Sequence, residues 1–405
     1  MTAPAQTERP LPVAGEAPAQ PDAIRALQLG LGWFAEQPGG LQRYYQELVK
    51  HLPAAGVMVR GLVCGSTAVE RESQGIVSAA IPSNALLIRR LAAFRRAIKR
   101  EMAEFRPDVV VSHFALYAWP VLHCLEGRPL VVHFHGPWHA ECRAEGSGRL
   151  KTWMKYRVEH AVYHRADRLI TLSHAFKNVL IRTFGVDESR VCVIPGGVSG
   201  RRFDLPHTRT DARIHLGWPR NRRIVLSVRR VTSRMGLEQL IDAAPMIRSR
   251  IPDVLLLIAG DGKPRGELQA RIDALDLGSH VRLLGYLPDE HLALAFRAAE
   301  LSVVPSIALE GFGMAAVESL AAGTPVVVTP VGGLPEIVRP FRPSLITADT
   351  GSQALADTIS AALEHPLALP TAAECRRYAG RFDWPRVAPA ISQLLCAVAK
   401  ESVAS

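Results

Sequence analysis

Two glutamates flank a glycine turn in the stretch Pro305–Leu320, which reads PSIALEGFGMAAVESL. Glu310 stands just before the turn Gly311–Gly313, and apolar residues from Met314 onward are spaced for a helix that packs on a sheet. The start of a helix offers unpaired N–H groups and the positive end of its dipole, and glycines let a ligand approach the backbone. The turn therefore predicts a phosphate-binding site.

Glu310 and Glu318 can face the same crevice, because Glu318 lies about one turn inside the expected helix. Carboxylates accept hydrogen bonds from hydroxyl groups, so a phosphate held between two of them indicates a sugar nucleotide. The plainer interpretation is that Glu310 caps the helix and Glu318 is solvated. Spacing alone favours neither interpretation.

Arg230 and Arg234 follow the expected strand Arg223–Val228, in a loop at its carboxyl end. Ligands bind at this end of the strands in open parallel sheets. A guanidinium suits a diphosphate because its planar fork binds two oxygens and keeps its charge. On spacing alone, however, such arginines are more often solvated at the surface.

The expected strand Leu130–Phe134 leads into the run HFHG. Alternation along a strand places His133 and His135 on one side, which would suit a pair of metal ligands. We find no third ligand at a convincing spacing and expect no metal. A purely structural role for His135 is the alternative to a role in binding.

Strands and helices alternate along both halves of the chain, which predicts two parallel sheets with helices on both faces and a cleft between them. The 405 residues suffice for two domains of ordinary size. Near the start of the first half, Gly39 and Gly40 open an expected helix and would present N–H groups to an anion. The expected segments are a disordered tail over 1–21, Rossmann-like domains over 22–205 and 206–380, and a final segment over 381–405.

Composition is that of a soluble globular protein, with 48% apolar and 21% charged residues. Six scattered cysteines without a C-x-x-C pair fit reduced thiols rather than a disulfide framework or a zinc site. The chain shows neither a secretory signal nor an apolar run long enough to span a membrane. We therefore expect a cytoplasmic protein.

The positive charge is concentrated in the first half of the chain. The whole chain has a net charge of +10, and residues 22–205 hold 25 Lys or Arg against 16 Asp or Glu, which implies an anionic partner. An expected helix over 85–107 is either a solvated basic face or a surface that leans on anionic lipid at the edge of a membrane. Its basic residues are Arg89, Arg90, Arg95, Arg96, Lys99 and Arg100.

Glu310, Glu318 and the glycine turn resemble the E-x7-E signature of the retaining glycosyltransferases of family 4, which have the GT-B fold. The segment AAGTPVVVTPVGGLPEIV (321–338) is similar to the family's following strand and second glycine loop, and the resemblance extends with gaps from about residue 28 to 395. It implies an α/β fold of two Rossmann-like domains that face a cleft. The run FDWPRVAPAISQLL (382–395) resembles the family's C-terminal helix, which crosses back onto the first domain.

The chain departs from the family pattern at two places. Arg230 matches the arginine of the family's G-R-L-x-x-x-K-G segment, but Met235 stands where lysine is usual. Arg234, one position earlier, would supply the missing charge if its side chain reaches inward rather than into solvent. The inter-domain segment, usually Pro-Asn-Gly-Val-Asp, has Gly196 and Ser199 where Asn and Asp are common.

The resemblance implies roles for the remaining candidates. Glu310 would hold sugar hydroxyls, His135 would lie beside the donor sugar, and Glu318 would hold ribose hydroxyls. The other implied donor contacts are Gly39, Gly40, Gly311, Phe312, Gly313 and Met314 near the phosphates, and Tyr286 and Leu287 at the base.

The resulting hypothesis is a retaining transferase that moves a sugar from a nucleoside-diphosphate sugar to an acceptor, such as a lipid-linked or polysaccharide precursor. Nothing resembles an Asp-x-Asp motif, so we expect neither a metal nor another cofactor, and no nucleic acid partner. The donor base, the sugar and the acceptor are left open by the sequence.

Three alternatives remain. A glycoside hydrolase also uses two carboxylates, but these must straddle the sugar bond. A nucleotide-sugar epimerase of the same fold would act without an acceptor. A non-catalytic paralogue would bind the sugar nucleotide only, and fold does not separate these cases.

Overall fold

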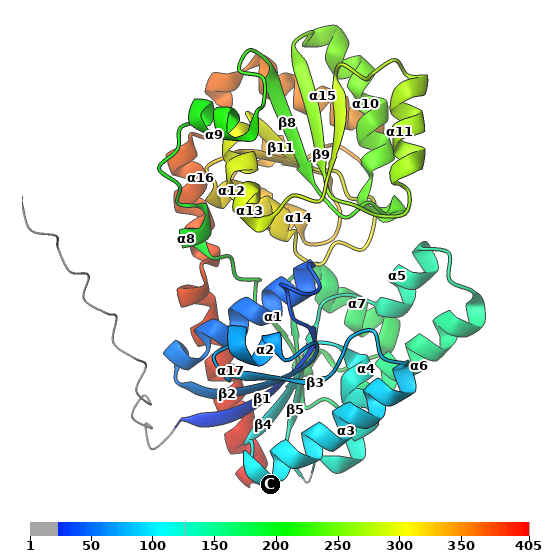
Figure 1. The fold of residues 1–405 in the computed structure, drawn as a ribbon, viewed down its shortest axis with the longest axis vertical. Helices are drawn as coiled ribbons and strands as arrows, with labels where there is room; N and C mark the ends of the chain where they lie inside the picture. The colour runs from blue at the N-terminus through cyan, green and yellow to red at the C-terminus, as the bar shows by residue number, and fades with distance from the viewer. Residues whose placement is uncertain (1–22, 126, 405) are drawn as a thin grey trace, which may run out of the picture.

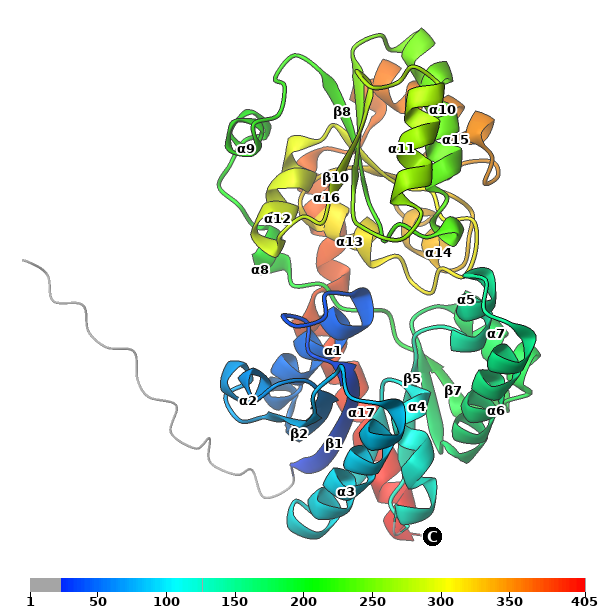
Figure 2. The same cartoon turned by 45° about the vertical axis from the view of Figure 1, so that its right-hand side comes forward.

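The computed structural model describes residues 23–125 and 127–404, which form two α/β domains arranged end to end (Figures 1 and 2). The tail expected over 1–21 lies outside the described residues. None of the described helices combines the length and apolar character that a membrane crossing requires.

The first domain is built on seven parallel strands in the order β3-β2-β1-β4-β5-β6-β7. Helices cover both faces of this sheet, so β4 and β5 are buried along their whole length and read as apolar runs. The strands are β1 (Ile24–Gly32), β2 (Val57–Cys64), β3 (Val77–Ile81), β4 (Val109–Ser112), β5 (Leu130–Phe134), β6 (Arg168–Thr171) and β7 (Val191–Val193).

The helices of the first domain follow these strands in turn. In the first of them, Tyr44, Tyr45, Leu48 and Val49 form the stripe that packs into the core. The helices are α1 (Gly40–His51), α2 (Ala68–Glu72), α3 (Leu87–Glu104), α4 (Ala115–Ala118), α5 (Trp138–Ala144), α6 (Arg149–Arg165) and α7 (His174–Phe184), with 3-10 turns η1 (Pro53–Ala55), η2 (Trp119–Cys124) and η3 (Glu188–Arg190).

The second domain has five parallel strands in the order β10-β9-β8-β11-β12. These are β8 (Arg223–Val228), β9 (Val254–Ala259), β10 (Val281–Gly285), β11 (Leu301–Val304) and β12 (Val326–Val328). Its helices are α9 (Arg209–Leu216), α10 (Leu237–Arg250), α11 (Arg265–Ala274), α12 (Asp289–Ala298), α13 (Met314–Ala321), α14 (Leu334–Val338), α15 (Ser352–Glu364) and α16 (Ala372–Ala379), with 3-10 turns η4 (Ser233–Met235), η5 (Pro343–Leu345), η6 (Pro366–Ala368) and η7 (Gly380–Phe382). The two sheets confirm the expected α/β fold.

The chain crosses between the domains twice, and the two crossings lie side by side. The first leads into the short helix α8 (Gly200–Phe203), and its Val198 N–H donates to the Phe382 carbonyl at 2.8 Å. The second starts α17 (Trp384–Ala404), which runs down the first domain in Figure 1 and confirms the expected return helix. Trp384 is fully buried, and a Cβ on Gly197 would lie only 2.3 Å from its ring.

The basic helix expected over 85–107 is shorter at both ends, as α3. Leu86 still has an extended backbone (ψ 140°), and Arg106 has a positive φ of 51° just before Pro107. A residue before proline disfavours the α conformation, so the helix ends ahead of it.

Candidate active site

A cavity of about 520 Å³ lies between the two domains. The carboxyl ends of β1, β4 and β5 line it from one side, and those of β8 and β11 from the other. The predicted residues that line it are Gly39, Gly40, His135, Arg230, Arg234, Glu310, Gly311, Phe312, Gly313, Met314 and Glu318. Tyr286 and Leu287, predicted at the base, do not line it, and the Tyr286 side chain is 56% exposed.

The glycine turn before α13 is held by close packing. Gly313 has a positive φ of 95°, and a Cβ there would meet Leu334 Cδ2 at 2.4 Å. A Cβ on Gly311 would lie 2.6 Å from the Phe176 ring of the first domain. No side chain caps the start of α13, so Glu310 does not cap this helix and that interpretation was wrong. The first N–H groups of α13 therefore remain available at the cavity wall.

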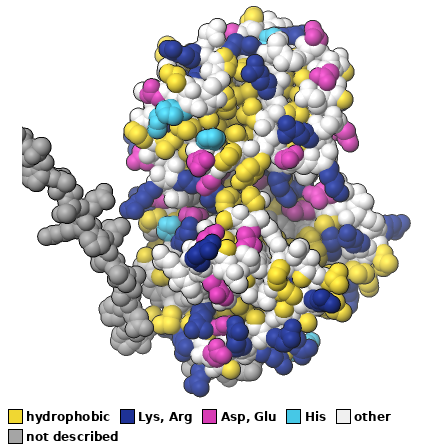
Figure 3. All heavy atoms as spheres, viewed as in Figure 1, with side chains coloured by type: hydrophobic (Ala, Val, Ile, Leu, Met, Phe, Trp, Pro, Cys, Tyr) yellow, Lys and Arg dark blue, Asp and Glu magenta, His cyan; other side chains and the backbone are white. Residues whose placement is uncertain are grey.

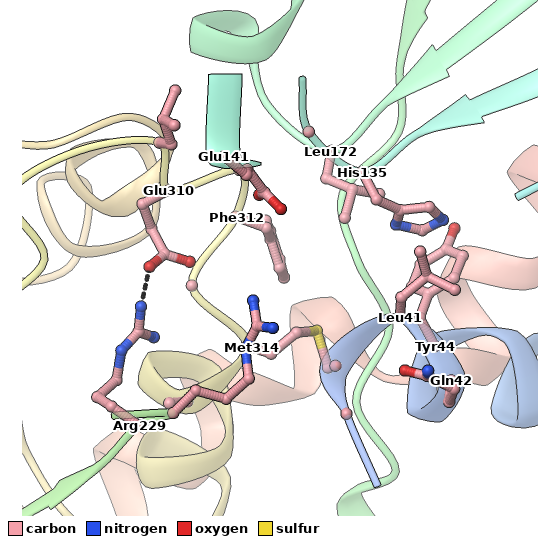
Figure 4. A pocket seen from close by; sticks show the side chains of 18 of the residues that line it. Leu41, Gln42, Tyr44, His135, Glu141, Leu172, Arg229, Glu310, Phe312 and Met314 are labelled. Carbon is pink, nitrogen blue, oxygen red and sulfur yellow. Dashed lines mark hydrogen bonds and ion pairs between the residues drawn. The ribbon is translucent and has the colours of Figure 1, made fainter. Parts of the chain in front are cut away.

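Glu310 is held in place by two donors from its own domain. Arg229 Nη2 and Ser306 Oγ (2.8 Å) both donate to Glu310 Oε2, as Figure 4 shows for Arg229. The residue before it, Leu309, has a positive φ of 54°, an uncommon conformation for a side chain of this size. Backbone and ion pair together fix the carboxylate at the cavity.

Arg229 is a site residue that the sequence analysis missed. It stands where the family segment has glycine, so the resemblance assigned it no role. Its side chain is only 7% exposed, and Nη2 also lies 2.7 Å from Met235 Sδ. The available signal was its position directly after β8.

Arg234 faces inward, as expected. Its side chain is 6% exposed; Nη1 donates to the Leu309 carbonyl at 3.1 Å, and Nη2 lies 3.2 Å from Glu141 Oε1. Arg230 is exposed but also lines the cavity. Three cavity arginines, Arg229, Arg230 and Arg234, therefore come from the segment that follows β8.

Glu141, on α5 of the first domain, is the second residue that the sequence analysis missed. Figure 4 shows its carboxylate close to Phe312, between Glu310 and His135. Burial raises the pKa of Glu141, while Arg234 and Arg230 act in the opposite direction. The buried Glu159 orients α5 by accepting hydrogen bonds from the N–H groups of Trp138 (2.8 Å) and His139 (3.0 Å). A glutamate in the helix after the HFHG run was the only signal for Glu141.

Glu318 is buried rather than solvated, so the plainer interpretation was wrong for this residue too. Its Oε1 accepts a hydrogen bond from Arg202 Nη1 at 3.0 Å. Arg202 also pairs with Asp289 of the second domain, and Asp289 pairs with Arg43 of the first. This network borders the cavity at the crossing between the domains.

His133 and His135 lie on one side of the sheet, and the neighbouring strand adds His113, the third histidine that the sequence analysis did not find. His113 Nε2 lies 2.9 Å from Gln28 Oε1, and its Nδ1 lies 3.4 Å from His135 Nε2. The three ring planes lie within 25° of parallel. One ring nitrogen of each histidine lies within 4.8 Å of the others, so the three side chains form a group that could hold a metal ion. Burial lowers the pKa of all three, that of His135 to about 4, and neighbouring histidines lower the pKa values of His113 and His133 further.

Two parallel-sheet domains that meet at a polar cavity define a protein of the GT-B class. Two family models match the chain in succession, "Glycosyltransferase Family 4" over residues 38–202 and "Glycosyl transferases group 1" over 208–382. D-inositol 3-phosphate glycosyltransferase of Geodermatophilus obscurus is 30% identical, over 92% of this chain and 87% of that protein. The chain therefore belongs to the family 4 glycosyltransferases.

Solved structures share the fold over nearly the whole chain. Sucrose-phosphate synthase from Thermosynechococcus elongatus has a TM-score of 0.78 at 25% identity, covering 94% of this chain and 100% of that one. HepE of Anabaena, solved in complex with UDP and glucose, has a TM-score of 0.77 at 22% identity, covering 92% and 100%.

Proposed function

We propose that this glycosyltransferase moves a sugar from a nucleoside-diphosphate sugar to an acceptor with retention of configuration. The observation that carries the proposal is the cavity itself, where an ion-paired carboxylate, Glu310, lies among arginines and a free helix start. The complex of HepE with UDP and glucose supports a nucleotide sugar as the donor.

Each charged group has a role in this proposal. Glu310 holds hydroxyls of the transferred sugar, and Glu318 holds those of the ribose. The diphosphate lies against the cavity arginines (Arg229, Arg230 and Arg234) and the N–H groups at the start of α13, which stabilise the charge that grows on it. The bond from the sugar C1 to phosphate breaks while the acceptor oxygen bonds to C1 on the same face. The acceptor's proton passes to the departing phosphate oxygen.

The arginines and helix N–H groups supply positive charge without a metal, so we propose that transfer is metal-independent. Activity should then survive treatment with EDTA. Loss of activity that magnesium or manganese restores would contradict this part of the proposal.

The acceptor is proposed to be a lipid-linked or polysaccharide precursor, used at the cytoplasmic face of a membrane. The cavity wall from the first domain is partly aromatic, with Phe114 and Trp138 in contact at a ring distance of 5.1 Å. Such a wall suits the apolar face of a sugar or the start of a lipid chain.

The alternatives predict different behaviour. A hydrolase needs carboxylates on both sides of the sugar bond, whereas Glu310 and Glu318 lie on one domain and are each paired with an arginine. Glu141 of the first domain also lines the cavity, so a hydrolase would have to use this carboxylate, which is paired with Arg234. An epimerase would convert the donor with no acceptor present. A binding paralogue would bind the donor and release no nucleoside diphosphate.

Two measurements test the proposal. A thermal-shift screen with UDP-, GDP- and ADP-sugars should show one base that raises the unfolding temperature, because the ligand binds only the folded chain. Glu310→Gln should then lose most turnover and keep its affinity for the nucleoside diphosphate. Normal turnover in Glu310→Gln, or acceptor-independent conversion of the donor, would refute the proposed transfer.

A further inference from the structure

Large apolar side chains reach the solvent on one side of the first domain. Seven of the twelve exposed large hydrophobic side chains in the described part of the chain fall between residues 86 and 154. Ile88 is 76% exposed, Leu150 72% and Trp153 58%. The seven are Leu86, Leu87, Ile88, Trp119, Leu150, Trp153 and Met154.

These side chains come from three neighbouring segments: the start of α3, the turn η2 and the start of α6. Both helices pack against η2, which therefore lies between them. On α6, Leu150, Trp153 and Met154 follow a three- and four-residue spacing and share one face. We refer to these seven side chains and the exposed cations of α3 and α6 as the α3–α6 face.

The same helices carry a strong positive charge. Figure 3 shows dark blue side chains among the yellow ones over this part of the first domain. The segment 147–158 contains no acidic residue. The acidic residues of α3 are Glu101, which is buried and paired with Arg60, and the exposed Glu104 at its last position. The exposed cations are Arg89, Arg95, Arg96, Lys99 and Arg100 on α3, and Arg149, Lys151, Arg157 and Arg165 on α6.

This mixture favours a lipid surface over a protein partner. The centre of a protein interface is depleted of charged residues, lysine among them. Here cations follow the exposed apolar residues at the start of α3 and lie between them on α6. A bilayer surface accepts both: apolar and tryptophan side chains enter the interfacial layer, and Lys and Arg contact anionic headgroups.

We propose that the α3–α6 face docks the protein on an anionic lipid bilayer. The role of this docking rests on the proposed function. Docking through the α3–α6 face would also determine the side from which the acceptor reaches the cavity. The helix α5, which carries the cavity residues Trp138 and Glu141, is followed by α6 after only a few residues. Phe114, also at the cavity, precedes α4 and η2. A lipid-linked acceptor held at the bilayer would thus meet the aromatic wall of the cavity first.

Vesicle flotation of the full chain tests the docking. Wild type should float with vesicles of equal phosphatidylcholine and phosphatidylglycerol at low salt, and much less with phosphatidylcholine alone or at high salt. The variant Leu150→Ser/Trp153→Ser/Met154→Ser should partition about tenfold less, because it loses its inserted side chains. The variant Arg95→Gln/Arg96→Gln/Lys99→Gln should lose most of the salt dependence.

The matched control is Ile214→Ser/Leu367→Ser, which removes exposed apolar side chains of the second domain and should float like wild type. Failure of wild type to float at low salt, or equal flotation of the Leu150/Trp153/Met154 variant, would overturn the docking proposal. Flotation requires no donor, and donor binding is read by thermal shift. A chain that floats but binds no nucleotide sugar would therefore refute the proposed function and leave the docking intact.

Discussion

Arg229 and Met235 meet at the carboxyl end of β8, where Arg229 Nη2 lies 2.7 Å from Met235 Sδ. The family segment has glycine and lysine at these positions, so in this chain a cation stands at the glycine position and methionine at the lysine position. Arg234 also faces the cavity, where it contacts the Leu309 carbonyl and Glu141. We infer that Arg229 brings the missing charge to the site.

Arg229→Ala should lower kcat/KM at least about a hundredfold, because a charged donor in a water-poor cavity contributes about 2–4 kcal/mol to the transition state. Adding Met235→Lys should restore part of the loss, since the ammonium would enter the space of the guanidinium. Steady-state kinetics on both variants, with circular dichroism as a check of folding, measures this. If kcat/KM of the double variant is no higher than that of Arg229→Ala, a lysine at position 235 cannot replace the arginine at position 229.

Glu141 carries a negative charge toward the arginines that we assign to the diphosphate. A donor bound to Arg234 would lie beside this carboxylate and be repelled by it. Glu141→Gln should therefore tighten binding of the nucleoside diphosphate by roughly three- to tenfold, the size of a partly screened charge interaction. Burial raises the pKa of Glu141, so the advantage of the variant should shrink as falling pH protonates the wild-type carboxyl.

Calorimetric titration with the preferred diphosphate would measure the effect of Glu141→Gln. Glu145→Gln is the matched control, because Glu145 ends the same helix and is exposed. Weaker binding in Glu141→Gln would contradict the repulsion and show that Glu141 instead holds Arg234 in its binding orientation.

At the scale of elements, the sequence was sufficient where local pattern decides structure. Apolar strands, the glycine turn before α13 and the return helix α17 follow from spacing and resemblance. Contacts between elements that are distant in the chain could not be predicted from the sequence. The pair of Arg229 and Glu310 joins two strand ends, and α5 reaches Arg234 across the cleft. The sequence also did not show which apolar side chains are exposed. The apolar spacing on α6 would be the same if these residues formed a buried stripe.

The histidines of β4 and β5 make an element-scale prediction on pH. Their pKa values are lowered in the fold, so below about pH 6.5 the unfolded chain binds protons that the folded chain does not. Stability should therefore fall as pH drops from about 6.5 toward 4, by up to about 1.4 kcal/mol per pH unit for each histidine.

His133→Leu should make this decline shallower, because it removes one of the three buried imidazoles that must take up a proton on unfolding. The substitution also removes the contact of His133 Nδ1 with the Tyr44 hydroxyl at 3.3 Å, which lowers stability at every pH. Urea unfolding across this pH range would measure the slope, with the exposed His291→Asn on α12 as control. An unchanged slope in His133→Leu would mean that other groups cause the acid sensitivity.

At the scale of the whole molecule, polar contacts across the cleft hold the two domains together. The Glu336 carboxylate of the second domain accepts hydrogen bonds from the N–H groups of His174 (2.9 Å) and Ala175 (2.8 Å), at the start of α7 in the first. Ser173, which caps α7, also donates to the Gly311 carbonyl at 2.5 Å. A helix start of one domain is thus capped by the other, directly behind the glycine turn.

Glu336→Ala should favour separation of the domains, because the helix start loses a carboxylate that also complements its dipole. Glu336 is exposed, so water will replace part of the interaction, and a cost of about 1 kcal/mol is expected, roughly a fivefold shift toward open molecules. Small-angle X-ray scattering should show a larger radius of gyration, and the KM for the donor should rise with little loss of stability in either domain.

Glu374→Ala is the matched control, since Glu374 caps α16 with Thr371 inside the second domain alone. It should lower the unfolding temperature without changing the radius of gyration. If Glu336→Ala instead behaves like this control, the cap across the cleft stabilises α7 only and does not govern closure.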